Sequence, residues 1–297
     1  MRMLARMRIA VTGANGFVGR ALCPFLEKHL GAELITLTRT PTQSNNQEVS
    51  FSATDQELIQ ALKGVDCLIH LAARAHTQNS TVTDFERDNQ TLTARILNLC
   101  VIAKIPRVIY LSSIKVNGNS TSGRMPYTAD DVPQPEDIYG QSKLDCENLL
   151  KQQLTHTEIQ WVIIRPPLVY GDNNKGNLHT LETLIGKHMP LPFGKLDNRR
   201  DLISIENLCN LIALCISHPN AANNIFLASD DISRSTRDII QLLANRKKIP
   251  VRFFNLPNWV FTLIKPCAPQ IIERLTGNLQ VDITKTKSLL GWNPDNK

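Results

Sequence analysis

The chain has 297 residues, of which 42% are hydrophobic and 20% are charged. This composition is typical of a globular protein with a large core, and it excludes a disordered chain, a collagen-like fibre and a small disulfide scaffold. With 33 basic and 27 acidic residues the formal net charge is +6, a mild excess that suits nucleic acid or a small anionic ligand. The length predicts one large α/β unit or two coupled lobes.

The cysteines and the apolar runs bear on location. Seven scattered cysteines form no Cys-x-x-Cys pair, which indicates a reducing compartment. No apolar run approaches the ~20 residues of a membrane span. Thr12, Gly13 and Asn15 interrupt the basic start, which makes it a poor signal peptide. We therefore expect a cytoplasmic protein with no membrane insertion and no metal site.

Strands and helices alternate through the first two thirds of the chain. Short β-branched runs predict strands at residues 8–11, 34–37, 65–71, 107–111 and 160–164. Helical patterns lie between them, at residues 17–30, 55–63, 85–103 and 137–154, and residues 40–47 form a polar loop. Near-continuous apolar strands separated by helices predict an α/β fold with a Rossmann-type, doubly wound parallel sheet.

The pattern changes after Pro166 and Pro167. Residues 171–200 are rich in glycine, proline and basic residues, whereas 203–216 and 224–228 resume the strand and helix patterns of the sheet. The remainder is helical and basic. The sequence predicts a Rossmann domain from residues 1–170 plus 203–228, and a smaller lobe from residues 171–202 plus 229–297.

A glycine-rich segment from Thr12 to Gly19 follows the first strand and opens the first helix. Gly13 permits the tight turn, Gly16 lets the backbone approach a pyrophosphate, and Gly19 lets the helix and strand pack closely. The free N–H groups of the helix start then bind the anion. A turn without a ligand is the alternative, but the three-residue spacing between a strand and a helix favours a dinucleotide site.

The residue at the end of the second strand indicates the type of cofactor. An acidic residue there binds the ribose hydroxyls of NAD, whereas an arginine accommodates the 2′-phosphate of NADP. Here the strand ends in Leu37-Thr38-Arg39. Arg39 therefore favours NADP(H), with NAD left open, and the alternative is an arginine of an exposed loop.

Tyr139 and Lys143 stand four residues apart, on one face of a predicted helix. A phenol is a weak acid–base catalyst at neutral pH, and a nearby ammonium lowers its pKa. Ser113 follows the strand at 107–111, and ligands of parallel sheets bind at the carboxyl ends of the strands. We expect the three side chains to meet.

These motifs occur together in one known family. The chain resembles the extended short-chain dehydrogenase/reductases, the NAD(P)-dependent nucleotide-sugar epimerases, dehydratases and ketoreductases, over essentially its full length. Within the family it is most similar to a bacterial subgroup encoded with surface-polysaccharide genes. Its members are often labelled UDP-glucose 4-epimerase, and some reduce UDP-4-keto-6-deoxy-N-acetylglucosamine. The motifs that carry the resemblance lie at residues 12–19, 66–73, Asn89, Thr93, 111–113, Tyr139, Lys143 and 165–171.

The resemblance implies a role for each matching residue. Ser113, Tyr139 and Lys143 would be catalytic, with Ser113 bound to the reacting sugar oxygen. The second lobe would bind the nucleotide sugar. The substrate residues would be Ser113, at the tip of a strand of the Rossmann domain, and Asn177, Leu178, Pro192 and Arg200 of the lobe. The cofactor would be bound by Gly13, Asn15, Gly16, Phe17, Val18, Gly19, Arg39, Leu71, Ala72, Ala73, Asn89, Lys143 and Pro166.

We expect an NAD(P)-dependent oxidoreductase acting at C4 of a UDP-sugar, with a 4-keto-sugar reductase favoured over a 4-epimerase. Ile114 and Lys115 stand where dehydratases carry an Asp-Glu pair, which disfavours dehydration. The intact Ser113, Tyr139 and Lys143 disfavour a non-catalytic, dinucleotide-binding regulator. The basic run at residues 246–248 is better explained as a solvated helix end than as a nucleic-acid site. A homodimer is left open.

Overall fold

The computed structural model describes residues 6–40, 46–74, 81–172, 174, 176–257, 263, 266 and 269–295. Within these residues, seven parallel strands form the main sheet in the order β3-β2-β1-β4-β5-β6-β9. The chain reverses direction across the sheet between β1 and β4, the switch point where doubly wound folds bind ligands. The strands are β1 (Arg8–Thr12), β2 (Glu33–Thr38), β3 (Gln47–Ser50), β4 (Cys67–His70), β5 (Arg107–Leu111), β6 (Gln160–Arg165) and β9 (Asn224–Leu227).

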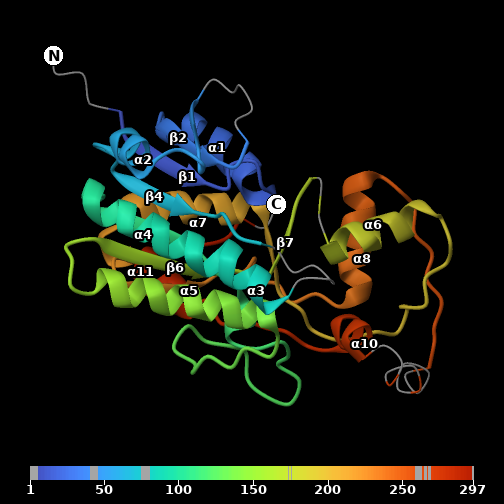
Figure 1. Ribbon diagram of the computed structural model, residues 1–297. Helices are drawn as coiled ribbons and strands as arrows, with labels where there is room; N and C mark the ends of the chain where they lie inside the picture. The colour runs from blue at the N-terminus through green and yellow to red at the C-terminus, as the bar shows by residue number, and fades with distance from the viewer. Residues whose placement is uncertain are drawn as a thin grey trace.

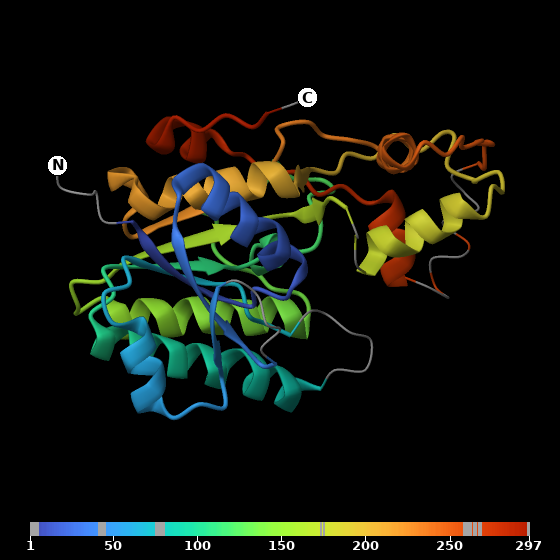
Figure 2. The same ribbon diagram turned by 90° about the horizontal axis from the view of Figure 1, so that it is seen from above.

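Helices cover both faces of this sheet (Figures 1 and 2). One face is covered by α1 (Phe17–Leu30), α7 (Ile205–Ser217) and α11 (Thr284–Leu290). The other is covered by α2 (Asp55–Leu62), α4 (Leu92–Ala103) and α5 (Ile138–Leu154). Each layer buries one apolar face of the strands, as their continuous apolar runs require. The predicted Rossmann-type α/β fold is therefore confirmed.

A smaller lobe lies to one side of the main sheet (Figure 1). Its helices α6 (Gly176–Gly186), α8 (Thr236–Lys247) and α10 (Pro269–Thr276) share an apolar core. A second, two-stranded parallel sheet joins it to the main domain, formed by β7 (Leu168–Tyr170) and β8 (Leu202–Ser204). Tyr170 and Leu202 pack into the core of the lobe, whereas Val169 and Ile203 pack against the core of the main sheet.

Several elements differ from the sequence expectation. The sequence did not predict β3, which begins at Gln47, the last residue of the expected polar loop. An edge strand needs no apolar run, and none of its residues is fully buried. The helix predicted at 85–103 starts earlier, as α3 (Val82–Phe85), and continues through a π-helical stretch, η1 (Glu86–Thr91), into α4. β8 pairs with β7, not with the main sheet.

The end of the chain also differs in its packing. The sequence assigned residues 229–297 to the second lobe, but the last described segment packs with the core under β6 and β9, through Leu279, Val281, Ile283, Leu290 and Trp292. Short 3-10 helices lie at η2 (Ile114–Val116) and η3 (Pro219–Ala221). In the parts of the chain that the structure describes, no helix has the length and apolar character to cross a membrane.

Candidate active site

The glycine loop is held in place by close backbone contacts at the switch point. Gly13 has φ +73°, and a Cβ there would lie 2.7 Å from the backbone nitrogen of Ala72, just past β4. A Cβ at Gly19 would lie 2.6 Å from the Cα of Ala14. Gly19 thus allows α1 to pack against the loop itself, and not against the strand as predicted. Both positions therefore require glycine.

The start of α1 fits an anionic ligand. Its N-cap residue, Gly16, is extended and offers no capping side chain, and the first turn carries no acidic residue. The N–H groups of Phe17, Val18 and Gly19 belong to this uncapped turn, where the helix dipole favours negative charge. Asn15 lies exposed on the loop, and its Nδ2 donates to the carbonyl of Thr40 at 3.4 Å. A dinucleotide pyrophosphate suits this surface.

A buried chain of hydrogen bonds fixes the adjacent end of β4. Thr12 Oγ1 accepts from the backbone nitrogens of Leu71 and Ala72, both at 3.1 Å. Its own proton therefore goes to His70 Nδ1 at 2.6 Å, which leaves Nε2–H to donate to Thr93 Oγ1 at 3.0 Å. Burial, with the nearby Lys143 charge, lowers the pKa of His70 to about 3. The neutral imidazole holds the partly exposed Leu71, Ala72 and Ala73 in position.

Asn89 links this strand end to the helix that carries the predicted catalytic pair. It is almost completely buried, its Oδ1 accepts from the Arg74 backbone nitrogen at 2.6 Å, and its Nδ2 donates to Ser142 Oγ at 3.1 Å. Ser142 immediately precedes Lys143 on α5. The predicted cofactor residue Asn89 therefore connects the two sides of the site.

The structure brings Ser113 and Tyr139 together, and they share a hydrogen bond. A Cβ at Gly140 would lie 2.6 Å from the carbonyl oxygen of Lys115, so the first turn of α5 contacts the turn after β5 backbone to backbone. Asp137 caps α5 by accepting from the Gly140 nitrogen at 2.7 Å, and it forms an ion pair with Lys115. The predicted cofactor residue Pro166 fixes the same turn, because its carbonyl accepts from the nitrogen of Ile114 at 2.9 Å.

The prediction that Lys143 lowers the pKa of Tyr139 is wrong, because burial and the neighbours Ser113 and Asp137 determine this pKa. Lys143 Nζ donates to the carbonyl of Leu111 at 2.8 Å and lies 4.7 Å from the centre of the Tyr110 ring. Burial lowers the pKa of Lys143 to about 8. Burial also raises the pKa of Tyr139 to about 12, outweighing the hydrogen bond from Ser113, which lowers it. The phenol is therefore protonated at neutral pH.

A buried ion pair between Glu147 and Arg165, which the sequence did not predict, supports this site. Glu147 of α5 accepts from Arg165 Nε at 2.9 Å and Nη2 at 2.6 Å, and from Ser112 Oγ at 2.5 Å. Arg165 Nη1 donates to Asn117 Oδ1 at 3.0 Å. Both charged side chains are at most 1% exposed. The pair ties α5, the end of β6 and the turn after β5 into one unit.

The predicted substrate residues lie in and beside the second lobe. Arg200 Nη1 donates to the carbonyl of Gly277 at 3.1 Å, and burial lowers the pKa of Arg200 to about 10. The backbones of Arg200 and Arg234 exchange two hydrogen bonds, at 2.9 and 2.8 Å. Pro192 is half-buried between two lobe-core residues.

Two of the predicted substrate residues, Asn177 and Leu178, lie on α6. Leu178 is buried in the lobe core, so contact with a substrate would involve its backbone. Asn177 lies in α6, but its side chain is outside the part of the chain that the structure describes.

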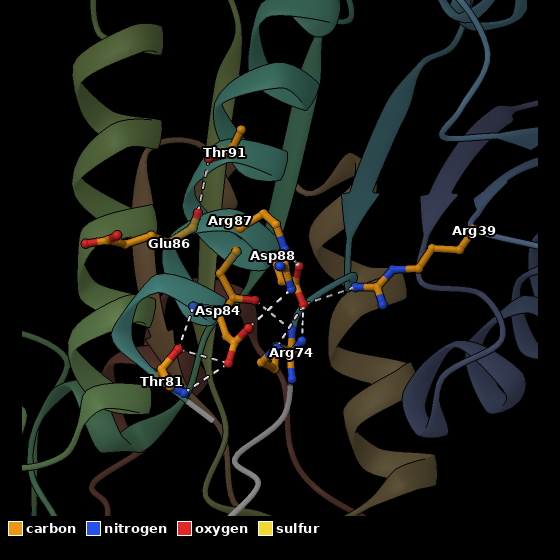
Figure 3. Close-up of polar contacts among 9 residues, drawn as sticks. Arg39, Arg74, Thr81, Asp84, Glu86, Arg87, Asp88 and Thr91 are labelled. Atoms are coloured by element: carbon orange, nitrogen blue, oxygen red, sulfur yellow. Dashed lines mark hydrogen bonds and ion pairs between the residues drawn. The ribbon is translucent and has the colours of Figure 1, made fainter. Parts of the chain in front are cut away.

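The side chain of Arg39 extends toward Asp88 of η1, which belongs to a cluster of charged side chains (Figure 3). Its Nη2 lies 3.9 Å from Asp88 Oδ2, and its side chain is 69% exposed. Asp88 is bound more closely by Arg87 and Arg74, and these hydrogen bonds hold the pKa of its carboxyl below the usual range. Sequence reasoning missed this cluster because its members come from three separate segments.

A doubly wound parallel sheet carries a glycine loop at its switch point, with a serine, a tyrosine and a lysine close together at the tip of β5. This is the arrangement of the short-chain dehydrogenase/reductases, a class of dinucleotide-dependent enzymes. The model of the NAD dependent epimerase/dehydratase family matches residues 9–228, and the chain belongs to that family.

Individual relatives agree. The chain is 37% identical to a UDP-glucose 4-epimerase of Vibrio cholerae over 300 residues, which cover 96% of this chain and 90% of the relative. Among solved structures, UDP-N-acetylglucosamine 4-epimerase from Bacillus cereus superposes with a TM-score of 0.79 at 21% identity, covering 98% of this chain and 92% of the other. MoeE5 in complex with UDP-glucose and NAD gives 0.76 at 21% identity, covering 98% and 94%. The family that the sequence motifs indicated is therefore confirmed.

Proposed function

We propose that the protein is a UDP-sugar oxidoreductase that acts at C4 of the sugar, as an NADPH-dependent 4-keto-sugar reductase in the synthesis of surface-polysaccharide precursors. The meeting of Ser113, Tyr139 and Lys143 at the tip of β5, beside the glycine loop, carries the proposal. Residues Gly13–Gly19 would hold NADPH, which when bound would supply the hydride for the C4 carbon.

The three side chains divide the remaining work between them. Ser113 donates a hydrogen bond to the C4 carbonyl oxygen and polarises it. Tyr139 donates its phenolic proton to the same oxygen, so that the ketone, one hydride and one proton give the alcohol. Lys143 would hold the nicotinamide ribose of the bound cofactor. Tyr139 carries its phenolic proton at neutral pH, which is the form that can donate a proton.

A 4-epimerase is the second candidate, favoured by the name of the Vibrio cholerae relative. In that reaction Tyr139 must first accept the 4-hydroxyl proton as a phenolate, and later return it after the ketone has turned. The same three side chains serve both reactions, so they do not decide between them. Arg39 favours the reductase, since a reductase that consumes external NADPH needs a residue for its 2′-phosphate.

The lobe contributes the proposed substrate residues. Arg200 is placed to bind the diphosphate through its planar guanidinium, which can bind phosphate oxygens in pairs. Asn177, Leu178 and Pro192 complete the proposed contacts with the UDP-sugar. Only Asp201 separates Arg199 and Arg200 from β8, so their backbone lies close to where the lobe meets the main sheet.

Two measurements on the purified protein test the function. The first identifies the cofactor released by heat denaturation at neutral pH, where both reduced and oxidised dinucleotides can be detected. The second follows NADPH absorbance with UDP-4-keto-6-deoxy-N-acetylglucosamine, and separately follows the interconversion of UDP-glucose and UDP-galactose without added cofactor. Consumption of NADPH with the ketosugar supports the reductase. Bound NAD together with sugar interconversion identifies an epimerase and refutes the reductase.

A further inference from the structure

Asp88 gathers three arginines from three segments of the chain (Figure 3). Arg74, four residues beyond β4, contacts Asp88 Oδ2 through Nε at 2.8 Å and Nη2 at 2.6 Å. Arg87, on η1, binds Oδ1 at 2.8 Å and also lies 3.3 Å from Asp84. Arg39 approaches Oδ2 to 3.9 Å. Three guanidinium groups and two carboxylates leave this cluster with a net charge of +1.

Asp88 serves as an anchor in this cluster and not as a ligand for ribose hydroxyls. Its side chain is only 12% exposed, and both carboxylate oxygens already accept strong, charge-assisted hydrogen bonds. Arg39, in contrast, donates no side-chain hydrogen bond within the described residues, and Arg74 binds Asp88 through one edge of its guanidinium. The donors that remain belong to the arginines, so the cluster suits an anion.

Residues of the Asp88 cluster lie on both sides of the glycine loop. Ala72, two residues before Arg74, is the residue that a Cβ on Gly13 would meet at 2.7 Å. On the other side Asn15 donates to the carbonyl of Thr40, the residue after Arg39. β2 and β4 are also the two neighbours of β1 in the sheet. Arg39 and Arg74 therefore flank the loop that would hold the cofactor pyrophosphate.

We propose that Arg39 and Arg74 together bind the 2′-phosphate of NADP(H), and that Asp88 positions Arg74 for this contact. The proposal rests on the cofactor preference proposed above and adds a second arginine to it. A phosphate monoester carries roughly two negative charges at neutral pH, which two guanidiniums can match with paired hydrogen bonds. The ribose hydroxyls of NADH carry no charge, so the pair would discriminate between the cofactors.

Calorimetric titration of NADPH and NADH into the wild type and three single variants tests the proposal. Arg74→Leu should weaken NADPH binding by ~10-fold or more, the expected cost of losing a charge-assisted phosphate contact, and should leave NADH binding unchanged. Arg74→Lys, which keeps the charge, should recover part of the affinity. Arg87→Leu is the matched control: it removes another partner of Asp88 but should change neither affinity.

The same titrations separate the other outcomes. An equal loss for both cofactors after Arg74→Leu would place Arg74 on the pyrophosphate and overturn the assignment. No loss for either would make Arg74 purely structural. Asp88→Asn should weaken NADPH selectively if Asp88 positions Arg74, whereas a gain in NADPH affinity would refute that role.

The test also keeps this proposal apart from the cofactor preference itself. If the wild type binds NADH as tightly as NADPH, the NADP(H) preference is wrong. If the wild type prefers NADPH and Arg74→Leu keeps that preference in full, only the role of Arg74 is wrong. The probe 2′,5′-ADP, compared with 5′-AMP, repeats both comparisons without the nicotinamide half and without turnover.

Discussion

The buried pair of Glu147 and Arg165 gives the sharpest prediction for stability. Glu147→Gln keeps the shape of the side chain but removes its charge, and it leaves the Arg165 guanidinium, 1% exposed, without its counter-ion. Breaking a buried ion pair by removing one partner costs about 3–5 kcal/mol. The neutral amide of this variant would also accept more weakly from Ser112, so the turn carrying Ser113 would loosen as well.

Urea unfolding followed by circular dichroism measures this cost. The free energy of unfolding should fall by about 3–5 kcal/mol, with little change in the dependence on urea concentration. Glu33→Gln is the control, because its pair with Arg8 spans 3.1 Å with the glutamate 51% exposed, and exposed pairs contribute about 0–1 kcal/mol. A loss for Glu147→Gln no larger than that of the control would refute the reasoning.

Three further predictions concern catalysis, substrate and pH. Tyr139→Phe should lower turnover by at least ~10²-fold, the usual contribution of a positioned acid–base group, with cofactor affinity unchanged; turnover near that of the wild type would eliminate Tyr139 as the proton donor. Arg200→Ala should raise the Michaelis constant for the UDP-sugar at least ~10-fold, while calorimetry finds NADPH binding unchanged; an unaltered affinity for UDP would remove Arg200 from the site. Because His70 has a pKa of about 3 when folded, only the unfolded chain gains its proton between pH 6.5 and 3. Stability should therefore fall by roughly 1.4 kcal/mol per pH unit below pH 6.5 on account of this residue. His70→Gln should show a shallower loss in acid, and equal slopes would contradict the assignment.

The elements that the sequence predicted well are those with a strong local signal. β5 and α1 have the predicted bounds, because each begins and ends where an apolar pattern does. The glycine loop was predicted because glycines at three-residue spacing between a strand and a helix are typical of a dinucleotide-binding turn. β3 was missed because it is a short edge strand with the sequence Gln-Glu-Val-Ser and only partial burial.

The features that could not be predicted depend on contacts between distant segments. Glu147 and Arg165 are separated by a helix end and a strand, so no spacing rule pairs them. The Asp88 cluster joins residues that follow two different strands. The pKa of Tyr139 depends on how deeply the phenol is buried, and the spacing to Lys143 does not contain that information.

The two-stranded sheet of β7 and β8 has a thermodynamic consequence for the whole molecule. Its side chains alternate between two cores: Tyr170 and Leu202 belong to the lobe, Val169 and Ile203 to the main domain. If the lobe alone unfolded, one face of this two-stranded sheet would be uncovered and Leu202, which is 1% exposed in the folded protein, would contact solvent. The backbone hydrogen bonds between β7 and β8 that hold Ile203 in place would then be lost as well. The lobe and the dinucleotide domain are therefore expected to unfold as one cooperative unit, with a single calorimetric transition.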